Sequence, residues 1–169
     1  MLAVIATPAF DPAGAAWLAA IRAAHDPLQD RVGPHVTLMF PVAVEDEATL
    51  RSRLQMLAIG TAPFAVAFDR LGRMEDPHQL KYRFLNVLLP DAESGMRLDA
   101  LHRAMTGAGG EYVPHLTISR FGAVYCARAL ERQLGPFTSP LRGRVAALEL
   151  LRLRQGAIRQ EACYALAQA

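Results

Sequence analysis

The chain has 169 residues, of which 52% are hydrophobic and 20% charged, and its formal net charge is +2. This composition excludes a disordered chain and supplies enough apolar side chains for a substantial core, so we expect one domain spanning residues 1–169. The small positive charge permits an anionic substrate without requiring nucleic acid. Every basic residue except Lys81 is arginine, which we attribute mainly to genomic base composition.

The first half of the chain predicts two strands that alternate with two helices. Asp11 suits a helix N-cap and Pro12 suits the first helical position. Acidic residues at 45–47 favour the start of the second helix, because they interact well with the helix dipole. The expected elements are a strand at 2–7, a helix closed by Pro27, a strand at 35–40 ended by Pro41, and a helix broken at Gly60.

The second half predicts a hairpin, a helix, a strand, a helix and a closing hairpin. Residues 64–68 alternate as a strand, and a charged turn at 72–79 leads to a second strand at 82–89. Pro90 and Asp91 are typical of a helix start. The remaining expected elements are a strand at 115–121, a helix at 127–134, and strands at 145–153 and 158–166.

The N-terminus and the two cysteines favour a soluble cytoplasmic protein, which we expect to be a monomer. The apolar N-terminal run has no basic segment before it and stops at Pro8, so it predicts a strand and not a signal peptide. No apolar run approaches the roughly 18–20 residues of a membrane span. Cys126 and Cys163 have no C-x-x-C spacing, so we expect two buried or half-buried thiols and neither a disulfide nor a zinc site.

One five-residue pattern occurs twice. Residues 34–38 read Pro-His-Val-Thr-Leu, and residues 114–118 read Pro-His-Leu-Thr-Ile. Because side chains alternate faces along a strand, the histidine and threonine of each copy point the same way and the apolar residues point to a core. A single copy is typical of an ordinary histidine at a strand edge. The recurrence predicts a functional pair, and none of the other three histidines has a hydroxyl residue two positions later.

The order motif strand, helix, two strands starts at His35 and again at His115, 80 residues later (115 minus 35). Two copies are too few for a solenoid. We therefore predict a bilobal α+β fold in which two mainly antiparallel sheets are related by a pseudo-twofold axis. Helices are expected on the outside and a cleft at the centre. Both histidine–threonine pairs would then face this one cleft.

Two histidines and two threonines suit metal-independent phosphodiester chemistry. Histidine titrates near pH 6.5, so one imidazole can take a proton from the attacking water while the other gives one to the leaving group. Threonine hydroxyls and an imidazolium can stabilise an anionic centre. No metal-ligand spacing, P-loop or G-x-S-x-G sequence is present, and neither cysteine has a nucleophile signature.

The duplicated motif in a chain of this length resembles the 2H phosphoesterase superfamily, and within it the bacterial 2′-5′ RNA ligase-like or RNA 2′,3′-cyclic phosphodiesterase group. The resemblance implies metal-independent opening of a 2′,3′-cyclic phosphate, usually to a 2′-phosphate, with reverse ligation also conceivable. It implies no cofactor. Its substrates would be RNA 2′,3′-cyclic phosphate ends or small cyclic nucleotides. By the same resemblance His35 would donate a proton, His115 would accept one, and Thr37 and Thr117 would bind the phosphate.

Arg120 resembles a basic residue that often follows the second motif of this family. It lies five residues from His115, so an ideal strand turns it away from the cleft, and it reaches the phosphate only if the strand ends or bulges. The alternative is a surface arginine. Tyr82 is a candidate for stacking on a base. Further candidates for the rim are Phe10, the tip Arg73–Lys81 with His78, and Arg83, although such residues are more often ordinary surface or core.

Two other interpretations remain open from the sequence. The chain could be a non-catalytic nucleotide- or RNA-binding module that keeps the same histidine and threonine side chains. Alternatively, the motifs could be purely structural, in which case alanine at both histidines would affect stability alone.

Overall fold

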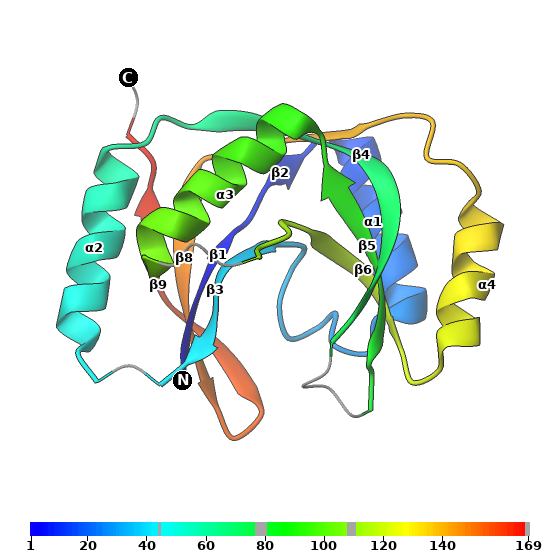
Figure 1. Cartoon of the computed structure of the whole chain (residues 1–169), viewed down its shortest axis with the longest axis horizontal. Coiled ribbons are helices and arrows are strands. Elements are labelled where there is room, and N and C mark those ends of the chain that lie inside the picture. Colours follow the sequence, from blue (N-terminus) through cyan, green and yellow to red (C-terminus); the bar gives the residue numbers. More distant parts are fainter. Residues whose placement is uncertain (44, 77–80, 108–110, 168–169) are drawn as a thin grey trace.

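The computed structural model describes residues 1–43, 45–76, 81–107 and 111–167 (Figure 1). The helices in these ranges are α1 (Pro12–His25), α2 (Glu47–Ile59), α3 (Ala92–Thr106) and α4 (Val124–Leu134). The strands are β1 (Leu2–Ala6), β2 (Ala9–Phe10), β3 (Val36–Val42), β4 (Phe64–Glu75), β5 (Phe84–Pro90), β6 (Leu116–Phe121), β7 (Leu141–Val145), β8 (Ala147–Arg154) and β9 (Ala157–Ala165). In the described part of the chain, no helix is long and apolar enough to cross a membrane.

Three helices begin at an aspartate that caps them. Asp11, Asp46 and Asp91 each accept a hydrogen bond from the backbone N–H three residues later, at 2.7, 3.0 and 2.8 Å. Such caps satisfy N–H groups that the first helical turn leaves without a partner. Helix α4 has no side-chain cap and begins at Val124, three residues before the predicted start.

The strands form one curled antiparallel sheet in the order β2-β7-β4-β5-β6-β3-β1-β8-β9. Its two halves meet at β3 and β6, where Val36 is paired with Leu116. Figure 1 shows β1, β3, β8 and β9 beside α2 in one half and β4, β5 and β6 beside α4 in the other. The predicted bilobal α+β fold with mainly antiparallel strands is therefore confirmed, and the two predicted sheets are continuous with each other.

The two halves are interlocked by their connecting helices. After β1 in one half the chain continues into β2 and α1, and α1 packs against β6 of the other half; α3 follows β5 and packs against β3 as well as against β4 and β5. Leu18 of α1 and Leu98 of α3 are fully buried in one core cluster that also contains Val36 and Leu116. The core therefore runs behind both motif strands and fixes them relative to each other.

Three expectations about the strands are wrong in detail. Strand β4 continues to Glu75 through the segment predicted as a turn, because its residues 68–75 pair with β5. Strand β3 passes Pro41 and ends at Val42; the proline lies at a shift in the pairing with β1, where no ladder hydrogen bond is needed from it. Strand β7, with three polar or glycine residues in Leu141–Val145, was not predicted.

Candidate active site

His35 and His115 lie near each other at the junction of the two halves, close enough for the charge of His115 to act on His35. Each is the residue immediately before its strand, β3 or β6. The next residues, Val36 and Leu116, are paired with each other and have no exposed surface. Since side chains alternate along a strand, both histidines point to the face opposite this core.

Thr37 and Thr117 complete the group. The antiparallel pairing of the preceding valine and leucine places His35 next to Thr117 across the strands. By the same register, His115 lies next to Thr37. The four side chains that the sequence singled out are therefore brought together on one face, each histidine beside the threonine of the other copy.

Both imidazoles are held by the same backbone hydrogen bond. Nδ1 of His35 lies 2.8 Å from the carbonyl oxygen of Gly33, and Nδ1 of His115 lies 2.8 Å from that of Val113. A carbonyl oxygen can only accept, so Nδ1 must carry the proton in both rings. The unprotonated nitrogen of each neutral ring is then Nε2, which is left to exchange a proton with a ligand.

Arg120 lies on the same face because β6 bulges. In the pairing of β5 with β6, Asn86 faces Ser119 but Val87 faces Thr117, so one extra residue is inserted in β6. Leu85 is paired with Arg120. Leu85 and Val87 share a face because they are two residues apart, so Arg120 and Thr117 share that face too. The bulge that Arg120 needs in order to share a face with Thr117 is therefore present.

A buried polar pair accompanies the bulge. The Ser119 hydroxyl donates to Asn86 Oδ1 at 2.8 Å and lies 3.3 Å from the Asn86 backbone nitrogen. Asn86 Nδ2 also donates to the carbonyl of Ala127 in α4 at 3.2 Å. Both side chains are fully buried, so these bonds satisfy groups that would otherwise be costly to bury. They also fix the shift of register on which the position of Arg120 depends.

Arg120 is joined to α1 by a carboxylate that two arginines share. Arg120 Nε lies 3.3 Å from Oδ1 of Asp26. Nη2 and Nε of Arg22 lie 3.0 and 3.1 Å from Oδ2 of the same carboxylate. The side chains of Arg22 and Asp26 are 6% and 1% exposed. The carboxylate of Asp26 therefore lies between two guanidinium groups beside the histidines, and a second carboxylate, Asp76, also acts on Arg120.

The charges around the two imidazoles differ. Burial lowers the pKa of His35 to about 4, and the positive charges of Arg22 and Arg120 act in the same direction. Burial also lowers the pKa of His115, and Arg120 contributes to this, but the carboxylate of Asp76 raises it. His35 therefore faces cations, whereas His115 faces one cation and one anion. Both rings have pKa values below 6.5, so both are neutral at pH 7 in the free protein.

The low pKa of His35 predicts a loss of stability in mild acid. Between pH 6.5 and about 4 the unfolded chain binds a proton that folded His35 cannot bind. At about 1.4 kcal/mol for each pKa unit, the free energy of unfolding should fall by about 3 kcal/mol over this window. The His35→Asn variant lacks the titrating ring, so its free energy of unfolding should fall correspondingly less over this window. Urea unfolding of the wild type and the variant at pH 7 and pH 4 would measure the two losses. Equal losses would contradict the burial of His35.

Comparison with known families identifies the chain. Residues 10–157 match the model of the 2′-5′ RNA ligase superfamily. The chain belongs to the 2′-5′ RNA ligase superfamily. The predicted relation to the 2H phosphoesterases is confirmed by this match. A search of curated proteins finds no significant match.

Solved structures from three organisms have the same fold. Escherichia coli LigT complexed with 3′-AMP has a TM-score of 0.59 at 18% identity, over 99% of this chain and 98% of that one. TT0787 of Thermus thermophilus has a TM-score of 0.57 at 19% identity, over 98% of both chains. Usb1 of Kluyveromyces marxianus has a TM-score of 0.59 at 11% identity, over 94% of this chain and 96% of that one. At these identities the likeness shows that the fold is shared.

Two side chains of this 2H phosphoesterase hold β3 where it leaves β6. The Tyr112 hydroxyl donates to the carbonyl oxygen of Thr37 at 2.8 Å, and His102 Nδ1 donates to that of Leu38 at 2.7 Å. The two rings stack at 3.9 Å with an interplanar angle of 8°. Val36–Leu116 is the one paired position between β3 and β6 in the described chain. The stacked pair therefore satisfies carbonyls that no ladder bond from β6 reaches.

Tyr112→Phe is expected to lower the free energy of unfolding by about 1–2 kcal/mol, because a half-buried carbonyl loses its donor while the ring stack remains. Urea unfolding at pH 7 measures the change. Tyr125→Phe is the matched control, since Tyr125 is 70% exposed and its variant should be within about 0.5 kcal/mol of the wild type. A Tyr112→Phe variant as stable as this control would contradict the role of the hydrogen bond.

The rim residues proposed from the sequence have different surroundings in the structure. Tyr82 is half-buried. The ammonium nitrogen of Lys81 lies over its ring, 5.2 Å from the ring centroid. Arg73 instead pairs with Glu131 of α4 at 2.6 Å. Arg83 pairs with Glu75, and His78 lies outside the described residues. Phe10 is wrong as a rim residue, because it packs on Phe68 against the core at the far edge of the sheet.

Arg22 and Asp26 were not found from the sequence. Their spacing of four residues in a helix is common for surface ion pairs, so it gave no sign that the pair is buried beside the site. Cys126 and Cys163 are free thiols; Cys163 is exposed, contrary to the expectation. Among the described residues, no three histidine, cysteine or acidic side chains gather where they could hold a metal ion.

Proposed function

We propose that this 2H phosphoesterase opens 2′,3′-cyclic phosphates, on RNA ends or small nucleotides, to a phosphomonoester by two-histidine acid–base catalysis. The observation that carries the proposal is the matched pair of Nδ1 hydrogen bonds, which leaves Nε2 of His35 and His115 free on one face. The family membership and the fold shared with LigT, which binds 3′-AMP, support a nucleotide substrate.

In the proposed reaction, water attacks phosphorus and one bond from phosphorus to a ribose oxygen breaks. Nε2 of one imidazole takes the proton from water, and Nε2–H of the other, protonated, imidazole gives a proton to the departing ribose oxygen. Thr37, Thr117 and Arg120 would stabilise the negative charge on the other phosphate oxygens. The bound phosphate is an anion, so it raises the pKa of both rings and allows one to be protonated near neutral pH.

The experiment that tests this function is turnover of a 2′,3′-cyclic mononucleotide in excess EDTA, with binding followed separately by calorimetry. The proposal predicts hydrolysis at an undiminished rate when metal ions are removed. A metal requirement would contradict the mechanism. Binding without hydrolysis across a panel of cyclic and 2′-5′-linked nucleotides would instead favour the alternative, a non-catalytic nucleotide-binding module.

The surrounding charges favour different roles for the two histidines in the free protein. Asp76 favours the charged form of His115, whereas His35 is surrounded by cations. These charges favour His115 as the proton donor and His35 as the base, the reverse of the assignment that the family resemblance implies.

An aryl phosphodiester distinguishes these assignments, because its phenolate leaves without needing a proton. The variant that lacks the donor should therefore keep most of its activity toward this substrate, and the variant that lacks the base should not. We expect His115→Asn to retain at least about tenfold more of the wild-type kcat/KM than His35→Asn does. The opposite ranking would support the roles implied by the resemblance.

A further inference from the structure

Thr7 is a third threonine on the face that carries the two histidines. It follows β1, whose last residue, Ala6, is paired with Val36. One further step of this antiparallel register places Thr7 beside His35. Ala6 and Val36 both belong to the main core cluster, so the side chains of Thr7 and His35 point to the opposite face. His35 therefore has a threonine on each side, Thr7 at the end of β1 and Thr117 in β6.

The hydroxyl of Thr7 is buried without a partner. In the described part of the chain, two buried polar side-chain atoms form no hydrogen bond, and these are Oγ1 of Thr7 and Nε of Arg120. Arg120 Nε lies 3.3 Å from Asp26, close enough for an ion pair but without the geometry of a hydrogen bond. Both atoms belong to side chains on the histidine face. Because a buried polar atom without a partner is costly, finding both of them here indicates groups that bind a ligand.

The second histidine has a different neighbour at the equivalent position. Leu88 of β5 is paired with Leu116, so the next step of this register places Leu89 beside His115. Leu89 is half-buried and has no polar atom in its side chain. The two halves of the site therefore differ, because His35 has a hydroxyl group where His115 has an apolar side chain.

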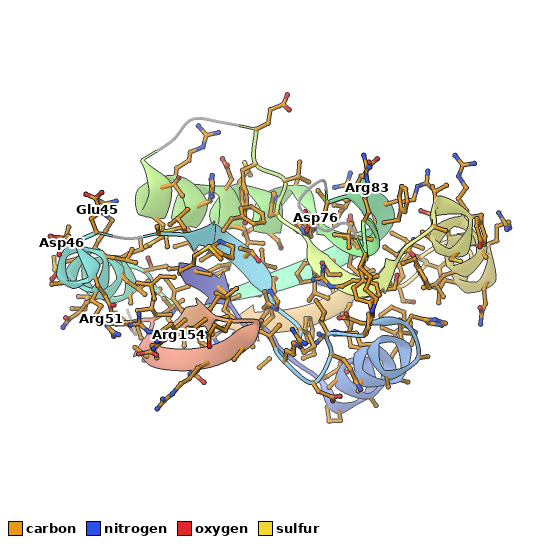
Figure 2. The ribbon with its side chains drawn as sticks, turned by 90° about the horizontal axis from the view of Figure 1, so that it is seen from below. Glu45, Asp46, Arg51, Asp76, Arg83 and Arg154 are labelled. Carbon is orange, nitrogen blue, oxygen red and sulfur yellow. The ribbon has the colours of Figure 1, made fainter. Side chains whose placement is uncertain are left out.

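The charges beside the two histidines differ in the same sense. The carboxylate of Asp76, the residue after β4, raises the pKa of His115. Its backbone N–H donates to the carbonyl oxygen of Arg83 at 2.8 Å, and Figure 2 shows both residues across the molecule from Arg154 of β8. The anion beside His115 therefore comes from the half that contains β4, whereas the hydroxyl beside His35 comes from the end of β1.

The two reacting oxygens of the proposed hydrolysis need different surroundings. The attacking water has two O–H groups, of which one gives its proton to the base and the other is left for a hydrogen-bond acceptor. The departing ribose oxygen is held by the sugar and needs only a proton from the acid. A hydroxyl beside His35 and a leucine beside His115 therefore match water at His35 and the ribose oxygen at His115.

We propose that Thr7 holds the attacking water beside His35, with its hydroxyl oxygen as the acceptor. Rotation about the Cα–Cβ bond of Thr7 turns the hydroxyl toward Nε2 of His35 and leaves the backbone in place. The water gives one proton to this nitrogen as its oxygen bonds to phosphorus. The bond from phosphorus to the ribose oxygen breaks, and His115 protonates that oxygen. This role of Thr7 rests on the proposed function and requires His35 to be the base.

Thr7→Val tests this role, because valine has nearly the same shape as threonine but no hydroxyl. With a 2′,3′-cyclic mononucleotide, kcat should fall about tenfold and KM should stay within about twofold of the wild-type value, because the variant loses the orientation of water and not of the nucleotide. Thr7→Ser keeps the hydroxyl and should restore most of kcat. The urea midpoint of Thr7→Val should not fall, because the hydroxyl that it removes has no partner.

Thr61→Val is the matched control. The Thr61 hydroxyl donates to the carbonyl oxygen of Leu57 at 2.7 Å, at the end of α2. The same chemical change here removes a hydrogen bond of the fold, so the urea midpoint should fall and kcat should stay unchanged. The two variants should therefore show opposite effects on stability and turnover.

Methanol as a competing nucleophile gives a readout that a purely structural role would not change. Methanol has a single O–H, which gives its proton to His35 and leaves none for Thr7. The ratio of methyl phosphodiester to phosphomonoester in water–methanol mixtures, measured by ³¹P NMR, should therefore rise at least about threefold in Thr7→Val. An unchanged product ratio, with or without a lower kcat, would overturn the role of Thr7 and leave the proposed function intact. A wild type that hydrolyses no cyclic nucleotide would overturn both.

Discussion

Replacing His35 and His115 together by asparagine is expected to lower kcat/KM for a 2′,3′-cyclic nucleotide by about four orders of magnitude. Each imidazole that transfers a proton contributes roughly 10²–10⁴-fold. Asparagine has an amide nitrogen near the position of Nδ1, so it can still donate to the carbonyls of Gly33 and Val113. The loss would then reflect the missing Nε2 and not a disturbed backbone.

The single variants His35→Asn and His115→Asn should each lose nearly as much as the double variant, because residues that act as a unit are not additive. His102→Asn is the matched control. His102 also donates from Nδ1 to a carbonyl oxygen, that of Leu38, but it is not one of the two motif histidines. Its variant should therefore lower the free energy of unfolding and leave kcat/KM largely unchanged. A double variant that keeps a tenth of the wild-type kcat/KM would exclude the two-histidine mechanism.

Asp26→Asn is expected to lower the free energy of unfolding by about 3–5 kcal/mol. The change removes the carboxylate charge shared by Arg22 and Arg120, and breaking one partner of a buried ion pair leaves uncompensated buried charge. Urea unfolding at pH 7 measures the loss. KM for a cyclic nucleotide should also rise, because Arg120 is no longer held on the histidine face.

Asp30→Asn is the control for this variant, since Asp30 is an exposed aspartate in the same loop. Its free energy of unfolding should be within about 0.5 kcal/mol of the wild-type value. If Asp26→Asn is as stable as Asp30→Asn, the carboxylate does not compensate the two guanidinium groups, and the position of Arg120 must have another cause.

The two motifs predicted more of the site than their length suggests. Alternation along a strand was enough to place each histidine with its own threonine, and the repeat predicted that residues 80 apart would meet. The cross-strand neighbours, His35 with Thr117 and His115 with Thr37, depend on the pairing of Val36 with Leu116. That register is set by packing against a core shared by both halves, which no local pattern reveals.

The position of Arg120 could not be predicted from the sequence alone. Periodicity could state that a bulge was needed, but the bulge is stabilised by Ser119 and Asn86, which are 33 residues apart. Likewise, Arg22 and Asp26 have the spacing of an ordinary ion pair on a helix surface, and the sequence does not show that the loop to Val32 covers them. Arg22 donates to the carbonyl oxygen of Val32 at 2.8 Å. The unpredicted features are those that depend on contacts between distant segments.

The most direct test of the central claim is hydrolysis of a 2′,3′-cyclic nucleotide in H₂¹⁸O with excess EDTA, followed by ³¹P NMR. If water attacks phosphorus between His35 and His115 without a metal, the cyclic phosphate signal should be replaced by that of a phosphomonoester carrying one ¹⁸O on phosphorus. A nucleotide that stays cyclic while bound to the protein, or label found on the ribose instead of on phosphorus, would contradict the mechanism.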